Sequence, residues 1–307
     1  MENKLHIITG NKGFVGINLS NYLNKLNKAI LGLSRSPNEK EVSYNQLNLD
    51  ILNKAKSFIH LAGKAHDLKK TSKDSEYFEV NTELTKKLFN QFLESECEVF
   101  IYMSSVKAAA DTVEGFLTEE TKPNPVTVYG KSKLAAEEYI LSKEIPQGKR
   151  VYILRPCMIH GPNNKGNLNL LFSFVSKGIP YPLGKYKNKR SFVSVKNLCF
   201  IINELIDNEN IKSGIYNIAD DESLSTTDLV KVIGDEIGKS AKILQVPKFM
   251  VNFLAKIGDV LPLPVNSERL QKLTENYVVS NDKIKKAIQK ELPLTTVKGI
   301  QKTISSF

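Results

Sequence analysis

Residues 9–16 read TGNKGFVG and directly follow the short apolar run LHII at residues 5–8. A β-branched run, a turn with spaced glycines and then a helical pattern predict a strand–loop–helix unit that binds phosphate. Glycines let the backbone turn tightly and approach a pyrophosphate, and the helix N-terminus supplies free N–H groups and a partial positive charge. The spacing is GxxGxxG, whereas the dinucleotide fingerprint is GxGxxG, so the loop alone leaves a purely geometric turn open as an alternative.

The length of 307 residues predicts about two domains, or one large α/β unit with a satellite. No early apolar run resembles a secretory signal, and no uncharged run approaches the roughly 18 residues needed to span a membrane. We therefore expect a cytoplasmic protein without a membrane span. The apolar stretch 243–265 is interrupted by Lys248, Lys256, Asp259 and three prolines. It predicts packed helix and loop, with a membrane-surface helix as the alternative.

The net charge of +10 fits either lysines spread over solvated faces or attraction of a polyanionic small molecule such as a dinucleotide or nucleotide sugar. Nucleic acid is disfavoured as a partner, because aromatic residues are not interleaved with the basic ones. Cys97, Cys157 and Cys199 lie far apart and form no CxxC, which indicates core thiols in a reducing compartment. The histidines show no metal-ligand spacing, so we expect no metal.

Strand and helix patterns alternate through the first half of the chain. The predicted strands are Leu5–Thr9, Ala29–Ser34, Ser57–Leu61, Val99–Met103 and Val151–Leu154. The predicted helices are Phe14–Asn27, Ser75–Glu94 and Val128–Lys143. This alternation predicts an α/β fold, a doubly wound parallel sheet of the Rossmann type with helices on both faces.

Beyond about residue 160 the alternation gives way to proline-marked loops and shorter helices, with predicted strands at Ser191–Val195 and Gly214–Ile218. We expect a dinucleotide-binding domain over residues 1–160 and a smaller, mixed substrate-binding lobe over residues 161–307. Within that lobe, we expect Ser191–Asp207 to return to the Rossmann sheet.

The second predicted strand ends at Ser34 and Arg35. In dinucleotide folds an acidic residue at this place binds the ribose 2′-hydroxyl, whereas an Arg suits a 2′-phosphate because its planar fork pairs with phosphate oxygens. The sequence therefore favours NADP(H) over NAD(H). An Arg35 that points into solvent is the alternative.

Tyr129 and Lys133 form a YxxxK pair, and residues four apart share one face of a helix. A nearby ammonium stabilises the phenolate and lowers the tyrosine pKa from about 10, which makes the hydroxyl a usable acid or base. Ser105 follows a predicted strand, where a hydroxyl faces the ligand crevice beside the Tyr.

The same YxxxK spacing occurs twice more, at Tyr139/Lys143 and Tyr181/Lys185. Prolines on both sides of Tyr181 prevent the helix that would align its Lys. Tyr139 is a further ten residues along the helix of Tyr129, about 15 Å away and rotated off its face. Tyr129 is therefore the expected catalytic tyrosine.

Together, the glycine loop, the Ser104-Ser105 pair and the YxxxK pair resemble the extended short-chain dehydrogenase/reductase family, in particular its nucleotide-sugar epimerase, dehydratase and reductase group. The resemblance covers nearly the whole chain. Thr9–Gly16 is similar to the family's TGxxGFxG loop. Further similar segments are Asn48–Ile51, His60–Gly63, Asn81, Arg155-Pro156, Asn163–Leu168 and Arg190–Val193.

The resemblance implies cofactor contacts from Gly10, Lys12, Gly13, Phe14, Val15, Gly16, Ser34, Arg35, Asp50, Ile51, Leu61, Ala62, Gly63, Asn81, Tyr129, Lys133 and Pro156. It implies substrate contacts from Ser105, Asn167, Leu168 and Arg190, with Arg190 on the diphosphate and Asn167 and Leu168 on uracil or its phosphates. Asp50 could instead be a solvated turn residue. His60 is expected in the core, His66 could line the sugar pocket, and Lys107 could be exposed or functional.

In the roles that the resemblance implies, Tyr129 exchanges a proton with the sugar C4 oxygen while a hydride passes between nicotinamide and C4. Lys133 holds the nicotinamide ribose, and Ser105 positions the C4 oxygen. The family's 4,6-dehydratases carry an Asp-Glu pair where this chain has Val106 and Lys107, so elimination is not expected.

Two reactions at C4 remain. Arg35 favours an exchangeable NADPH, which fits a reductase better than an epimerase. The segments Ser105–Lys107 and Gly161–Leu170 are also similar to those of bacterial UDP-4-keto-6-deoxy-hexosamine 4-reductases. This resemblance implies reduction of a UDP-4-keto-6-deoxy-N-acetylhexosamine in bacterial surface-polysaccharide synthesis. The alternatives are a UDP-sugar 4-epimerase with tightly bound NAD and a non-catalytic dinucleotide-sensing protein. The resemblance also implies a homodimer through the helices Ser75–Glu94 and Val128–Lys143.

Overall fold

A computed structural model describes residues 4–39, 41–64, 73–164, 167–261 and 266–307. Its main sheet has seven parallel strands in the order β10-β7-β5-β4-β1-β2-β3. These strands are β1 (Leu5–Thr9), β2 (Ala29–Ser34), β3 (Glu41–Ser43), β4 (Ala55–His60), β5 (Val99–Met103), β7 (Arg150–Pro156) and β10 (Gly214–Ile218). All five residues of β5 are buried, as expected for a central parallel strand that is covered on both faces.

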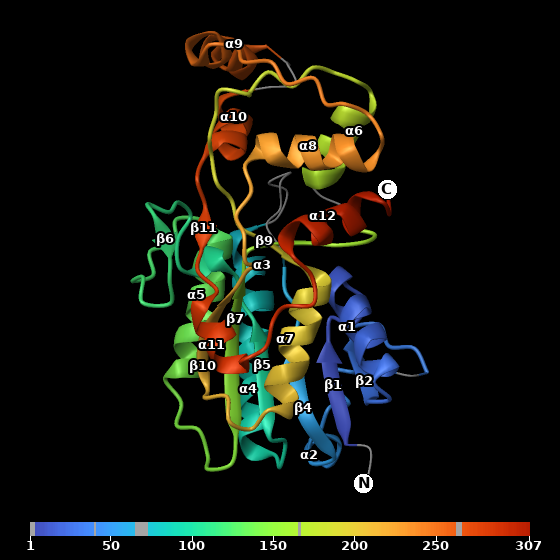
Figure 1. The fold of residues 1–307 in the computed structure, drawn as a ribbon. Coiled ribbons are helices and arrows are strands. Elements are labelled where there is room, and N and C mark those ends of the chain that lie inside the picture. The colour runs from blue at the N-terminus through green and yellow to red at the C-terminus, as the bar shows by residue number, and fades with distance from the viewer. Residues whose placement is uncertain (1–3, 40, 65–72, 165–166, 262–265) are drawn as a thin grey trace.

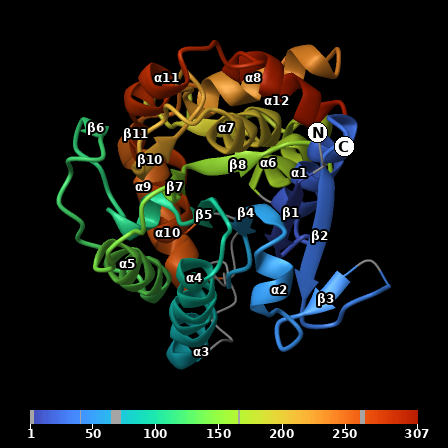
Figure 2. The ribbon, with the colours of Figure 1, turned by 90° about the horizontal axis from the view of Figure 1, so that it is seen from below.

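Helices cover both faces of the sheet (Figure 2). One layer holds α1 (Phe14–Lys25), α7 (Val195–Asp207) and α11 (Asp282–Ile288). The other holds α2 (Leu49–Leu52), α3 (Asp74–Phe78), α4 (Leu84–Glu94) and α5 (Val128–Leu141). Ile7 and Ile8 belong to two different core clusters, because successive side chains of a strand point to opposite faces. The doubly wound parallel sheet expected from the sequence is confirmed.

A second layer of structure lies over the carboxyl end of the sheet (Figure 1). It contains α6 (Asn167–Ser176), α8 (Thr226–Glu236), α9 (Lys248–Val260), α10 (Ser267–Thr274) and α12 (Thr296–Ile304). These helices share a core of their own, with Leu229, Ile233 and Ile300 among its buried side chains. Two small parallel pairs connect the layers: β8 (Met158–His160) with β9 (Phe192–Ser194), and β6 (Phe116–Leu117) with β11 (Val278–Val279).

The sequence predicted that Ser191–Asp207 returns to the main sheet, but the returning stretch extends further and includes β10. As expected, α7 packs against α1, but β9 pairs with β8 in a separate small sheet. β10 pairs with β7 as the edge strand of the main sheet, although it lies within the range expected to form the substrate lobe. The helix expected over Ser75–Glu94 is interrupted by a π-helical segment, Glu79–Glu83, between α3 and α4.

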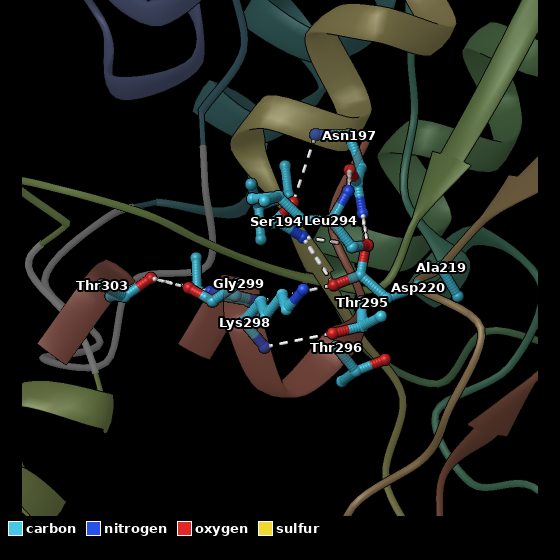
Figure 3. A network of polar contacts seen from close by, with 12 residues as sticks. Ser194, Asn197, Ala219, Asp220, Leu294, Thr295, Thr296, Lys298, Gly299 and Thr303 are labelled. Carbon is cyan, nitrogen blue, oxygen red and sulfur yellow. Dashed lines mark hydrogen bonds and ion pairs between the residues drawn. The ribbon is translucent and has the colours of Figure 1, made fainter. Parts of the chain in front are cut away.

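A buried polar network fixes the C-terminal helix to the sheet side (Figure 3). Asp220, just after β10, accepts hydrogen bonds from the Ser194 N–H at 3.1 Å and from Asn197 Nδ2 at 2.8 Å. Asn197 also bonds the Leu294 backbone in both directions, at 2.8 Å through Nδ2 and 3.0 Å through Oδ1. The loop that enters α12 is therefore held to the first turn of α7.

Within the described part of the chain, no helix is both long and apolar enough to cross a membrane. Cys97, Cys157 and Cys199 are buried free thiols, as the sequence predicted.

Candidate active site

Two cavities meet along the carboxyl edge of the sheet and share Gly63 and Lys64. The larger, about 890 Å³, is lined by Gly10, Asn11, Lys12, Leu33, Ser34, Arg35, Ser36, Tyr44, Ala62, Gly63, Lys64, Glu76, Glu79, Val80 and Leu84. The smaller, about 260 Å³, is lined by Leu61, Gly63, Lys64, Met103, Ser104, Ser105, Tyr129, Lys133, Pro156, Cys157 and Ile159. Because β1 lies between β2 and β4, the cavities occupy the topological switch point where doubly wound sheets bind ligands.

The glycine loop forms one wall of the larger cavity. Gly10 has φ +67°, and a Cβ there would lie 2.9 Å from the Ala62 nitrogen. A Cβ on Gly16 would lie 2.2 Å from the Gly10 carbonyl oxygen, so the glycine lets α1 start directly against the turn. Gly13, Phe14, Val15 and Gly16 line neither cavity. They form the helix start behind the loop, whose free N–H groups favour a phosphate.

Lys12, Ser34 and Arg35 line the far end of the larger cavity, where β2 ends. Next to them is Glu41, which no local sequence pattern singles out and whose side chain is almost fully buried. Its carboxylate lies 2.8 Å from Lys12 Nζ and accepts a hydrogen bond of 2.6 Å from Asn11 Nδ2. These two partners lower the pKa of Glu41 against the opposing effect of burial.

Asp50 and Ile51 line neither cavity, and their contact with the cofactor stays a prediction of the family resemblance. The Asn48 side chain accepts a hydrogen bond of 3.0 Å from the Ile51 N–H and so caps the short helix α2. The first turn of α2 then exposes Asp50 to solvent.

Asn81 lines neither cavity, yet it holds the wall between them. It is fully buried in the π-helical segment, and its amide bonds the Lys64 backbone as acceptor at 2.7 Å and as donor at 3.0 Å. The same amide donates to Ser132 Oγ at 3.0 Å, next to Lys133 in sequence. Asn81 therefore acts by positioning the Gly63–Lys64 segment and α5.

Ser105, Tyr129 and Lys133 all line the smaller cavity. The Thr127 hydroxyl caps α5 by accepting from the Gly130 N–H at 3.2 Å, which places Tyr129 in the first turn. The side chains of Tyr129 and Ser105 are hydrogen bonded to each other. Lys133 Nζ donates to the Met103 carbonyl at 2.8 Å and lies 4.9 Å from the centre of the Tyr102 ring, so its ammonium is fixed in the wall of this cavity.

The pKa shifts at this site favour the uncharged forms of Tyr129 and Lys133. Burial raises the pKa of Tyr129, and the hydrogen bond with Ser105 offsets this only in part. Burial lowers the pKa of Lys133 to about 8, against the opposing charge of Glu137. The expected lowering of the Tyr129 pKa is therefore wrong for this structure, because removal of the phenolate from water dominates.

A buried ion pair beneath Lys133 was also missed. Glu137 lies one turn after Lys133 in α5, and Arg155 Nε donates to its two oxygens at 3.0 and 3.1 Å. The Ser104 hydroxyl donates to the same carboxylate. The spacing of four residues from Lys133 to Glu137 was visible in the sequence, but the partner on β7 was not.

Other expected residues lie away from the cavities. His60 is fully buried between the hydroxyls of Thr9 and Thr85, and burial lowers its pKa to about 3, so it is the core residue that was predicted. Lys107 donates to the Asp111 carbonyl at 2.8 Å, and its ammonium lies 4.4 Å from the centre of the Tyr277 ring.

None of the expected substrate-contact residues of the lobe lines the two cavities. Leu168 is buried in the core of the lobe. The Arg190 guanidinium bonds the Lys272 carbonyl and lies 3.5 Å from Glu275 Oε1. The Asn167 side chain and His66 lie outside the described residues. Among the described residues that line the smaller cavity, none carries a carboxyl group.

Comparisons with known proteins agree with this geometry. The NAD dependent epimerase/dehydratase family matches residues 6–219. A UDP-glucose 4-epimerase of Vibrio cholerae is 30% identical and covers 98% of this chain and 94% of its own. A GDP-6-deoxy-D-mannose reductase of Pseudomonas aeruginosa is 25% identical, over 79% of this chain and 83% of its own.

A third relative is the N-acetyl-alpha-D-glucosaminyl-diphospho-ditrans,octacis-undecaprenol 4-epimerase of Escherichia coli O157:H7, at 26% identity over 70% of this chain and 63% of its own. Among solved structures, MoeE5 in complex with UDP-glucose and NAD superposes with a TM-score of 0.75. It covers 98% of this chain and 97% of that one at 19% identity, which supports the fold.

Proposed function

We propose that this chain, which belongs to the NAD dependent epimerase/dehydratase family, transfers a hydride between a nicotinamide cofactor and C4 of a nucleotide-activated sugar. One observation carries the proposal. Ser105, Tyr129 and Lys133 line a single cavity that adjoins the larger one behind the glycine loop. A dinucleotide along both would bring its nicotinamide end to the tyrosine and its adenosine end to β2.

The cofactor would be held by the glycine loop, the end of β2, the Leu61–Gly63 segment and Lys133, and when bound it supplies or accepts the hydride. The chain's own residues handle the proton. The Tyr129 hydroxyl donates a proton to the C4 oxygen during reduction, and Ser105 orients that oxygen by a hydrogen bond. The raised pKa of Tyr129 keeps the hydroxyl protonated at neutral pH, as a proton donor requires.

We favour reduction of a UDP-4-keto-6-deoxy-N-acetylhexosamine. Arg35 lines the adenosine end of the larger cavity, where its guanidinium suits a 2′-phosphate and therefore an exchangeable NADPH, whereas the neighbouring Lys12 is already paired with Glu41. The smaller cavity has no carboxyl group among its described lining residues, so it lacks the acid and base that dehydration needs. In the nucleotide-sugar complex, Asn167, Leu168 and Arg190 remain proposed contacts.

A UDP-sugar 4-epimerase is the second candidate. It is supported by the Vibrio cholerae relative, a UDP-glucose 4-epimerase that matches this chain over nearly its whole length. An epimerase removes and returns the hydride within one turnover, so it needs no added cofactor once NAD is bound.

The test is to mix the purified protein with NADPH or NADH and a UDP-4-keto-6-deoxy-N-acetylhexosamine made in situ, and to follow the absorbance of the reduced cofactor. Stoichiometric consumption supports the reductase. Interconversion of UDP-sugar isomers without consumption supports the epimerase. Because the Escherichia coli relative is named for an undecaprenol-diphosphate-linked sugar, the same isomer assay should include such a substrate. Failure of all three assays would overturn the proposal.

The cofactor preference is tested by Arg35→Asp. Loss of a charge-assisted hydrogen bond costs about 1.5–3 kcal/mol, so we expect the ratio of kcat/KM for NADPH over NADH to fall about 10- to 100-fold. Lys25→Asp makes the same charge change at an exposed position at the end of α1 and should leave the ratio unchanged. An unchanged ratio in Arg35→Asp would mean that Arg35 points into solvent.

A further inference from the structure

Helix α9 presents an apolar face to solvent. Val251 and Ala255 point into the lobe and are only 5% and 1% exposed. At about 100° per residue, the opposite side carries Phe249, Phe253 and Val260, which are 74%, 65% and 85% exposed. A surface helix of a globular protein normally places its polar residues on that side. The pattern of α9 is therefore the reverse of a solvated helix.

Helix α9, which carries this band, lies at the end of the molecule farthest from the sheet (Figure 1). Met250 and Leu254 widen the band along the helix, and Leu244 and Leu261 extend it at either end, each about half exposed. Along its length, α9 packs against α10, which lies on the lobe side. The band is a contiguous apolar surface at an extremity of the chain, and such patches mark binding surfaces.

The surroundings of this band are strongly cationic. Segments 177–190 and 237–261 run side by side, since the Tyr181 N–H donates to the Lys242 carbonyl at 2.7 Å and the Gly184 N–H to the Leu244 carbonyl at 3.0 Å. Together they contain nine lysines and arginines and a single acidic residue, Asp259. Of the nine, Arg190 is paired with Glu275, and in the neighbouring α10 the carboxylate of Glu268 is paired with Lys272. The Asp259 carboxylate accepts from the Ser267 N–H and hydroxyl, at 2.9 and 2.6 Å, and is thus engaged at the start of α10.

We propose that α9 is a membrane-surface helix that seats its apolar face in the headgroup region of an anionic phospholipid bilayer. At 13 residues it is too short to span the hydrocarbon, and it would lie in the plane of the interface. Phe249 and Phe253 would enter the boundary between headgroups and acyl chains. Lys248 and Lys256 lie on one flank of the helix, where they can meet lipid phosphates.

Charge selects this occupant over a second copy of the chain. A two-fold contact through α9 would bring the same cationic segments of both copies together, and like charges across an interface are unfavourable. An anionic bilayer instead satisfies both the apolar face and its cationic border. Membrane docking is independent of the proposed reaction, because none of the exposed side chains of α9 lines the cavities at the sheet edge or is a proposed substrate contact.

The chain contains no tryptophan, so Phe253→Trp places a single reporter on this face. The full-length variant is titrated with vesicles of phosphatidylcholine alone or mixed with phosphatidylglycerol. We expect a blue shift of the emission only with the anionic vesicles, and its reversal at high salt. No shift with anionic vesicles would overturn the proposal.

Vesicle flotation of the wild-type chain and of Phe249→Ser/Phe253→Ser provides the matched comparison. Both phenylalanines are exposed, so the double variant should keep its circular dichroism and its turnover of soluble substrate while binding anionic vesicles at least tenfold more weakly. Phe116→Ser removes an equally exposed ring on β6 and should float like the wild type. Equal flotation of all three would overturn the proposal, as would loss of self-association in the double variant together with no vesicle binding by the wild type.

Discussion

Lys133 is buried, and burial disfavours its ammonium charge. Its pKa is therefore lowered to about 8. As pH rises through that value, the free protein loses the Lys133 charge in the cavity that Tyr129 also lines. The pKa of Tyr129 is raised, so its phenol stays protonated over the same pH range. A loss of activity in this range would therefore come from Lys133 and not from Tyr129. We expect kcat/KM for reduction to fall above about pH 8, measured as a pH profile, since this parameter reports groups of the free enzyme.

The companion variant is Tyr129→Phe, which keeps the ring and removes the proton donor. We expect kcat to fall about 10²- to 10⁴-fold while NADPH binding, followed by fluorescence, is retained. A wild-type profile that stays flat well above the pKa of Lys133 would contradict the first expectation. Full turnover by Tyr129→Phe would contradict the assignment of Tyr129 as proton donor.

At the level of residues, the sequence predicted those whose role depends on local spacing. Gly10, Gly16, Tyr129 and Lys133 belong to patterns of a few residues, and the structure places each where its pattern requires. The pairings of Glu41 with Lys12 and of Arg155 with Glu137 could not be found in this way, because the partners lie 29 and 18 residues apart in sequence. Burial effects on the Tyr129 pKa were equally invisible, since they depend on the surrounding tertiary packing.

The contact between α1 and the glycine loop has no spare space. Gly16→Ala would place a methyl group 2.2 Å from the Gly10 carbonyl oxygen, and the neighbouring atoms are backbone. We expect a loss of about 1–3 kcal/mol of unfolding free energy, measured by denaturant titration. Gly13→Ala meets its nearest atom at 3.2 Å and should cost much less. Equal stability of the two variants would contradict the close-approach argument.

The junction between α7 and the loop before α12 depends on Asp220. Asp220→Ala leaves the donors of Ser194 and Asn197 without this acceptor in a buried place, and we expect a loss of about 3 kcal/mol of unfolding free energy. Its neighbour Asp221 forms a partly exposed pair with Lys285 at 3.0 Å, so Asp221→Ala should cost less than about 1 kcal/mol. Thermal unfolding of both variants compares the two losses of unfolding free energy. A similar loss in each would contradict the central role of Asp220.

Elements of the first half were predictable because a parallel sheet alternates strands with crossover helices in a regular way. Where tertiary contacts set the element, prediction failed. The π-helical segment within the predicted helix Ser75–Glu94 places Asn81 against Lys64 and Ser132, and no local pattern announces such contacts. β10 reads locally as a strand, but its place at the edge of the main sheet depends on its pairing with β7.

Across the whole molecule, the two small strand pairs join segments that are far apart in the sequence. β6 pairs with β11 and β8 with β9, and both join the first half of the chain to the lobe. No local sequence pattern predicts which of two distant strands will pair, because the pairing depends on how the intervening chain folds. The division into a domain of residues 1–160 and a lobe of residues 161–307 therefore remains an expectation, while the placement of the site at the carboxyl edge follows from the sheet order.

The pair α4 and α5 is our proposed dimer face. The two helices lie side by side on one sheet face, and Tyr139 Oη donates to Asn90 Oδ1 across them at 2.8 Å. Their outward sides expose both signs of charge, with Lys87 and Glu94 on α4 and Lys131 and Glu138 on α5. Unlike the cationic surroundings of α9, a face with both signs can complement itself about a two-fold axis.

We therefore expect light scattering after size exclusion to give twice the chain mass of 34.4 kDa. Leu141→Glu places a charge on the half-exposed end of α5 and should shift the mass toward the monomer, because burial of an unpaired charge is costly. Phe116→Glu adds the same charge on β6 and should leave the dimer intact. The Phe249→Ser/Phe253→Ser variant should also remain dimeric, which separates this face from α9. A wild-type chain that stays monomeric at the concentrations of the assay would contradict the prediction, and a dimer that only the α9 variant breaks would move the interface to the lobe.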